Sequence, residues 1–74
     1  MYDIFGVLEY GSIVAADADR GLVITYNGSC TFNVWLVDGY EFEPIECFTR
    51  DGATASTARA IAAEWLDACL GGEP

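Results

Sequence analysis

The chain has 74 residues, of which 53% are hydrophobic and 14% aromatic; twelve acids against three arginines, with no lysine or histidine, give a formal net charge of −9. This length predicts one small domain near the lower limit for a core that is stable without help, and the apolar content excludes a disordered acidic tail. The charge argues against binding to nucleic acid or anionic membrane and favours cationic partners, although acidity also serves solubility alone.

The first fifty residues alternate apolar and polar side chains and are rich in β-branched and aromatic residues, which is typical of strands. Five segments show this pattern: YDIFGVLEY (2–10), SIVAA (12–16), LVITY (22–26), CTFNVWLV (30–37) and IECFTR (45–50). Turn signals separate them: Gly11, DADRG (17–21), NGS (27–29) and DGYEFEP (38–44). DADRG begins like a calcium loop but lacks the later ligands, so we expect a turn stabilised by aspartate side chains.

Strand pairing is predicted from the apolar faces. A three-residue loop at 27–29 pairs Tyr26 with Cys30 and Ile24 with Phe32, and this register brings the apolar residues of both strands to one face. A slip of one residue would turn one of the two apolar sets to the other side of the sheet.

Across the acidic turn, the same reasoning places Leu36 opposite Cys47 and Asp38 opposite Ile45, so that Ile45 and Cys47 extend the core face. The reverse face of the sheet is also apolar. Its large side chains are expected to be Phe5, Val7, Ile13, Val23, Trp35, Val37 and Phe48. Because large apolar patches are uncommon on monomers, we expect this face to form an interface, unless the sheet curls and covers itself.

After Asp51-Gly52 the pattern changes to that of a helix over about 54–70, which Thr54 or Ser56 caps and Gly71-Gly72 ends. Its apolar stripe at 3.6-residue spacing consists of Ala58, Ile61, Ala62, Trp65, Leu66 and Cys69. We therefore predict a single α+β domain over 1–74, an antiparallel sheet of four to five strands with one C-terminal helix packed on one face.

Most residue types of catalytic sites are missing. Without histidine and lysine there is no usual general base, Schiff-base amine or P-loop lysine. Cys30 and Cys47 are expected on the core face as inert thiols, and the wide spacing of residues 30, 47 and 69 does not suit zinc. We predict no enzymatic activity, no metal and no cofactor.

Localisation is predicted from what the chain lacks. No stretch approaches the roughly 20 apolar residues of a membrane span. The first residues, MYDIFGVLEYG, have neither a basic region nor a small-residue cleavage site, as a signal peptide would. An odd number of cysteines, three, argues against a secreted disulfide framework. We expect a cytoplasmic protein.

The segment VDGYEFEPIE (37–46) contains Asp38, Glu41, Glu43 and Glu46 and no base. In an extended chain, Glu41 and Glu43 point to the same side about 6.6 Å apart, which resembles the spacing of successive phosphates in a DNA strand. These four carboxylates are candidates for binding a lysine- and arginine-lined groove built for nucleic acid. The alternative is a solvated acidic loop.

With VDGYEFEPIE and ASTARAIAAEWLDACLGG (55–72), this small, acidic chain resembles over its whole length the phage-encoded anti-CRISPR proteins, best the group that inhibits type I-C systems. The resemblance implies a stoichiometric inhibitor that acts in the cytoplasm of an infected or lysogenic bacterium, binds the surveillance complex (Cascade) and blocks binding of target DNA. It assigns no role to an individual residue. The alternatives are a phage or plasmid adaptor that uses its apolar sheet face, and an inhibitor of a restriction enzyme or another DNA-binding protein.

A homodimer is also expected, because a small core and a spare apolar face both gain from a partner. Trp35 and Phe48 are candidates for its interface. Cys69, in the last helical turn, is the thiol expected to link two chains. Two points argue against this disulfide: Cys69 belongs to the apolar stripe of the helix, and the cytoplasm is reducing.

Overall fold

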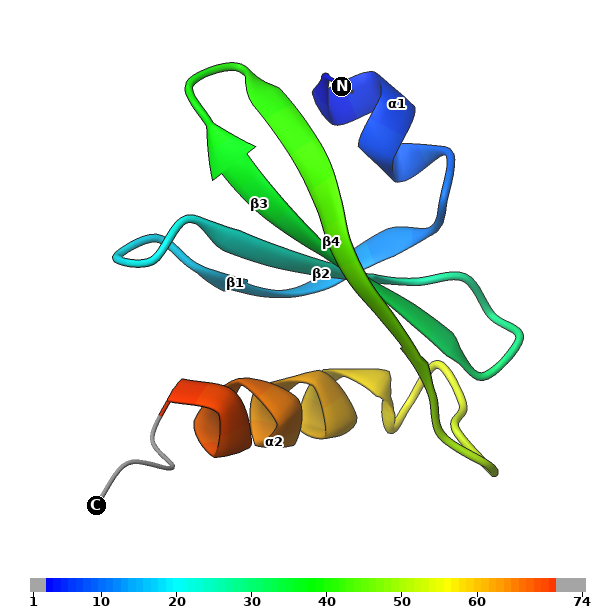
Figure 1. The fold of residues 1–74 in the computed structure, drawn as a ribbon. Coiled ribbons are helices and arrows are strands. Elements are labelled where there is room, and N and C mark those ends of the chain that lie inside the picture. The colour runs from blue at the N-terminus through cyan, green and yellow to red at the C-terminus, as the bar shows by residue number, and fades with distance from the viewer. Residues whose placement is uncertain (1–2, 71–74) are drawn as a thin grey trace.

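The computed structural model describes residues 3–70, and side chains up to residue 68. Its elements are α1 (Ile4–Leu8), β1 (Ser12–Asp17), β2 (Leu22–Tyr26), β3 (Thr31–Asp38), β4 (Glu41–Thr49) and α2 (Ala58–Leu70). The four strands form one antiparallel sheet in the order β1-β2-β3-β4, with α1 and α2 on opposite sides of it (Figure 1). The predicted α+β class with its C-terminal helix is confirmed. Within the described residues, neither helix has the length and apolarity needed to cross a membrane.

The predicted first strand, 2–10, is wrong, because its described part contains the helix α1. Asp3 is the N-cap of this helix, and its Oδ1 accepts a hydrogen bond of 2.9 Å from the Gly6 amide. A short polar side chain at this position satisfies one of the free amides of a first helical turn. Val7, fully buried, packs with Trp35 and Phe42 on the reverse face of the sheet. The reverse face is therefore partly covered by the chain's own N-terminal helix.

The pairing of β2 with β3 is shifted by two residues from the predicted register. Tyr26 pairs with Phe32 rather than with Cys30, and Ile24 pairs with Val34. Cys30 adopts a left-handed backbone conformation, with φ of 62°, which takes it out of the pairing. Because the shift is two residues, the same side chains still face the core.

The tip of the β3–β4 hairpin is tighter than predicted. Only Gly39 and Tyr40 connect the strands, and positive φ at Gly39 alone, 65°, is the signature of a II′ hairpin turn. Asp38 therefore pairs with Glu41 and not with Ile45. The segment 38–44, predicted as a break, lies largely within β4.

A bulge in β4 reverses the predicted faces beyond it. Leu36 faces Glu43 instead of Cys47, and the pairing then skips Ile45. Downstream of this bulge, Phe48 pairs with Phe32 and points toward α2, while Cys47 is exposed. The predicted placement of Phe48 on the reverse face and of Cys47 in the core is wrong, because one extra residue inverts the alternation.

The main core lies between the sheet and α2. The Phe48 ring stacks on Phe32 at a centroid distance of 4.9 Å and on Trp65 at 5.5 Å. The predicted stripe of α2 is confirmed for Ala58, Ile61, Ala62, Trp65 and Leu66, all of which are buried or packed against this core. α2 begins at Ala58, somewhat later than predicted, after a turn in which the Ala58 amide bonds the Thr54 carbonyl at 2.9 Å. The Cys69 side chain and the predicted helix end at Gly71-Gly72 lie outside the described residues.

Gly11 is a position where only glycine fits. Its φ is +135°, and a Cβ on it would lie 2.2 Å from the backbone oxygen of Tyr26. We expect Gly11→Ala to lower the free energy of unfolding by about 2 kcal/mol or more, because the backbone must move. Urea denaturation measures this loss.

Gly28→Ala is the matched control. Gly28 also has positive φ, +87°, but nothing lies within 4 Å of the position that a Cβ would take there. This variant should lose only about 1 kcal/mol of the free energy of unfolding, which is the cost of placing a residue with a Cβ at positive φ. Equal losses in the two variants would contradict the close approach at Gly11.

Candidate partner-binding surface

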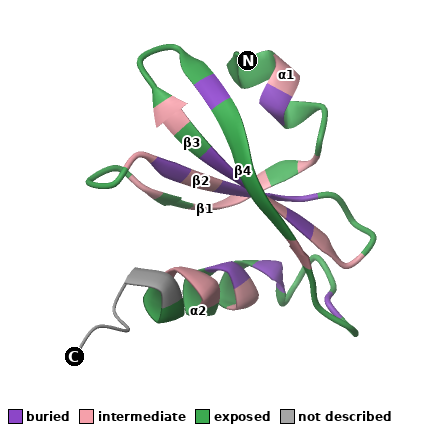
Figure 2. Cartoon of the chain, viewed as in Figure 1, coloured by how far each residue is buried: buried purple, intermediate pink, exposed green. Residues whose placement is uncertain are grey.

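The β3–β4 hairpin presents all four carboxylates that the sequence singled out. Asp38, Glu41, Glu43 and Glu46 are all exposed, and Figure 2 shows β4 exposed over most of its length. Glu43 pairs with Leu36. The other cross-strand partners are Asp38 for Glu41 and Val34 for Glu46. Since directly opposite residues share a face, the four carboxylates lie on the α2 side of the sheet, on the part of the hairpin that α2 leaves uncovered.

The spacing of these charges follows from strand geometry. Glu41 and Glu43 are alternate residues of one strand, about 6.8 Å apart along it. Asp38 and Glu41 face each other directly across the turn, where like charges are destabilising by about 0.2–1 kcal/mol. The four carboxylates therefore form an acidic array over two strands, in which Asp38 and Glu41 repel each other at the tip of the hairpin.

No arginine of the chain neutralises this array. Among the described residues, the ion pairs are Arg20–Asp17 at 3.4 Å and Arg50–Glu64 at 3.6 Å. Arg59 lies exposed on α2. The array is therefore available to a cation from outside the chain.

A second acidic turn joins the same end of the sheet. The β1–β2 turn contains Asp17 and Asp19, and the Val37 amide donates a hydrogen bond of 2.7 Å to the Gly21 carbonyl in this turn. Figure 1 shows both turns at one end of the sheet. As predicted, an aspartate stabilises the turn: Asp17 Oδ1 accepts from the Arg20 amide at 3.2 Å.

β4 is an edge strand whose free backbone ladder is interrupted near its middle. Pro44 has no amide hydrogen, and the bulge at Ile45 interrupts the pairing pattern. Both features hinder the addition of a partner's strand. Tyr40, 92% exposed at the tip, and Ile45, 49% exposed, add apolar area beside the carboxylates.

The dimer candidates Trp35 and Phe48 do not share an open surface. Trp35 is only 1% exposed; its Nε1 donates to Thr25 Oγ1 at 3.1 Å, and Tyr10 packs edge-on against its ring. Phe48 lies on the other side of the sheet, in the stack with Phe32 and Trp65. An interface formed by Trp35 and Phe48 together is therefore wrong for this fold.

The structure assembles no metal-binding cluster from the residues it describes. Across 3–68, where the structure describes the side chains, cysteine, aspartate and glutamate form no group of three or more suited to a metal ion. Cys30 is half-buried, with its Sγ 3.6 Å from the Ala53 carbonyl oxygen, and Cys47 is exposed. The side chain of Cys69, the predicted linking thiol, lies outside the described residues.

One signal for the hairpin was present in the sequence. Gly39-Tyr40 precedes the alternation E-F-E, and glycine as the first of two loop residues is the sequence preference of a II′ hairpin turn. The exposed apolar residues of α1 carried no such signal. They are Ile4, Phe5 and Leu8.

Comparisons with protein-family models, with curated proteins and with solved structures find no match to this chain.

Proposed function

We propose that this chain is a non-enzymatic, stoichiometric inhibitor whose acidic hairpin binds a basic, nucleic-acid-binding protein surface. The observation that carries the proposal is the array of Asp38, Glu41, Glu43 and Glu46, exposed on one face and without an ion pair in the described part of the chain. The repulsion between Asp38 and Glu41 across the turn costs stability, and a cationic partner would offset this repulsion by its attraction to both carboxylates.

The proposed target is a subunit of a CRISPR surveillance complex (Cascade), at the surface where it binds target DNA. This choice rests on the resemblance to anti-CRISPR proteins of the type I-C group. A net charge of −9 steers the chain toward such a basic groove and raises the association rate at low ionic strength. Occupation of the groove by the acidic hairpin would exclude DNA by competition.

A pull-down from cells that express the surveillance complex tests this function. We expect the chain to capture the surveillance complex, and the captured complex should no longer bind target DNA. The amount captured should fall as salt rises, because exposed charges are screened beyond about 8 Å at physiological salt. The chain alone should not shift duplex DNA in a gel. Capture that is indifferent to salt, or a DNA shift by the chain alone, would contradict the proposal, and capture of a restriction enzyme instead would redirect it to that target.

The second candidate function is a small phage or plasmid adaptor that binds through apolar contacts. The observation favouring it is the outer side of α1, where Phe5 is 74% exposed and Ile4 and Leu8 are also exposed. Patches of this kind mark interaction sites. Replacing Phe5 with serine would abolish partner capture by an adaptor at any salt concentration, whereas loss of capture on acid reversal would favour the inhibitor.

We expect the chain to form a homodimer with Cys69 as the linking thiol. Light scattering should give a dimeric mass, and part of this mass should be lost with reductant or with Cys69→Ser. Cys47→Ser is the control, because Cys47 is exposed in the described structure. A monomeric mass in every condition would contradict the homodimer. A dimer that only Cys47→Ser weakens would mean that Cys47, and not Cys69, is the linking thiol.

A further inference from the structure

The side of the sheet on which α1 packs has no charged residue in its strands, all of which the structure describes. Directly opposite residues share a face, and the pairings put Val23, Trp35 and Pro44 together on this α1 side. The charged strand residues all belong to the α2 side; they are Asp17, Asp38, Glu41, Glu43 and Glu46. In a chain with a net charge of −9, the strands therefore leave one side of the sheet uncharged.

The outer surface of α1 is apolar. Phe5 is 74% exposed, and Ile4 and Leu8 are exposed as well. Successive residues of a helix are about 100° apart around its axis, so Phe5 points to nearly the opposite side of α1 from Val7, which is buried against the sheet. The Phe5 ring therefore projects away from its own sheet.

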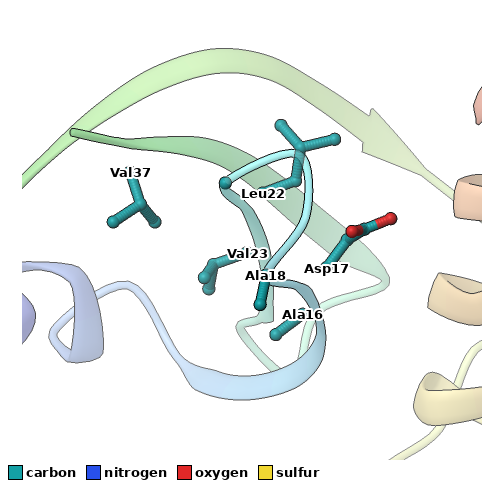
Figure 3. Close-up of a pocket in the computed structure, with 7 residues that line it drawn as sticks. Ala16, Asp17, Ala18, Leu22, Val23 and Val37 are labelled. Carbon is teal, nitrogen blue, oxygen red and sulfur yellow. The ribbon is translucent and has the colours of Figure 1, made fainter.

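An apolar pocket of about 320 Å³ lies beside the β1–β2 turn. The side chains that line its apolar part are Ala16, Ala18, Val23 and Val37 (Figure 3). Val23 and Val37 also border the cluster under α1. The lining carboxylate, Asp17, is turned away from these valines and pairs with Arg20 at 3.4 Å. An apolar cavity of about 150 Å³ is enough for benzene, so this pocket suits a phenyl ring.

We propose that the α1 side is the interface of a homodimer in which Phe5 of each copy enters the pocket of the other. In a two-fold dimer the same surface of both copies meets, so a projecting group and the pocket that receives it lie on one side of the molecule. Phe5 and the apolar part of the pocket meet this condition. The proposal rests on the expected homodimer, for which it names the surface, and it needs no bond through Cys69.

Charge favours a second copy at this surface. Two chains of −9 repel each other, and contact through the α1 side keeps their acidic hairpins apart. Packed sheets lie about 10 Å apart, and α1 adds to this distance, so the two arrays are separated by more than the Debye length of about 8 Å. Asp3 and Glu9 flank α1 and still repel. Added salt should therefore strengthen the dimer, whereas it weakens binding by the hairpin.

Sedimentation equilibrium in the presence of reductant tests this interface. Phe5→Ala should raise the dissociation constant of the dimer at least about 100-fold, because each dimer loses two phenyl groups. Ala16→Leu fills the pocket and should raise this constant about tenfold or more. The controls are Tyr40→Ala, at an aromatic residue that is 92% exposed on the hairpin tip, and Ala63→Leu, at an exposed position of α2. Both controls should dimerise like the original chain.

A mixture of the Phe5→Ala and Ala16→Leu chains tests the contact itself. The first variant keeps the pocket and the second keeps the phenyl group, so a mixed dimer has one intact contact and neither variant paired with itself has any. We expect more dimer in the mixture than in either variant alone at the same total concentration. Without any substitution, dilution of the original chain should shift the methyl signals of Val23 and Val37 in nuclear magnetic resonance spectra.

The opposite results overturn this interface. A monomeric mass at every concentration and salt would contradict both the homodimer and its surface, but not the inhibitor function, which capture of the surveillance complex tests separately. A dimer that neither variant weakens, a mixture with no more dimer than its components, or valine methyls that stay still on dilution would place the contact elsewhere. Dimerisation that weakens as salt rises would mean that charged groups, and not the α1 side, hold the copies together.

Discussion

Replacing both Glu41 and Glu43 with lysine should abolish inhibition while the fold stays intact. The two carboxylates are exposed and, in the described part of the chain, form no ion pair, so their loss should change the free energy of unfolding by less than about 0.5 kcal/mol. Toward a basic partner, two attractive charges become repulsive at the centre of the array. We expect at least a 100-fold loss of affinity for the surveillance complex, about 2.7 kcal/mol, measured by competition with target DNA.

A second double variant, Asp51→Lys with Asp67→Lys, separates the array from net charge. Each acid-to-lysine change adds two charges, so both double variants carry −5 instead of −9. Asp51 and Asp67 are exposed and lie outside the hairpin, and this control should lose only the part of the association rate that long-range steering supplies. Equal losses in the two variants would mean that net charge and not the array binds the partner.

Phe32→Ala should remove a large part of the protein's free energy of unfolding. Phe32 is fully buried, and its ring lies between Tyr26 and Phe48, with both centroids at 4.9 Å. Removing a buried phenylalanine side chain costs about 3–5 kcal/mol, whereas a domain of this length has only about 4–11 kcal/mol in total. Thermal unfolding followed by circular dichroism measures the loss.

Phe5→Ala makes the same chemical change at a site that is 74% exposed. It should alter stability by no more than about 0.5 kcal/mol. A Phe5→Ala variant as unstable as Phe32→Ala would mean that α1 buries Phe5, contrary to the structure. Since Phe5 is also the main apolar residue of the adaptor alternative, this variant serves the binding assays as well.

The candidate surface was predicted in composition but not in shape. The sequence showed that Asp38, Glu41, Glu43 and Glu46 have no internal counter-charge, and that Glu41 and Glu43 lie on one side of an extended segment. The pairing of Asp38 with Glu41 depended on a turn of two residues. The closeness of the β1–β2 turn to Val37 depended on strand order, which brings both hairpin turns to one end of the sheet.

By itself, the sequence determined the α+β class, four strands that approximate β1 to β4, and the apolar stripe of α2. These features depend on side-chain periodicity, which is local and survives any packing that keeps the pattern. The same periodicity cannot choose between registers that differ by two residues, because both bring the same faces together. The pairing of Tyr26 with Phe32 therefore depended on the backbone of the loop at 27–30, where Cys30 has positive φ.

Two features were decided only by the tertiary structure: the helical conformation of residues 4–8, and the side of the sheet on which Phe48 lies. Five residues are too few for a helix that is stable on its own, so α1 depends on the Asp3 cap and on the burial of Val7 against Trp35 and Phe42. The bulge at Ile45 moved Phe48 from the predicted reverse face to the α2 core. One unpaired residue inverts every side chain beyond it, and packing of Phe48 between Phe32 and Trp65 stabilises that inversion.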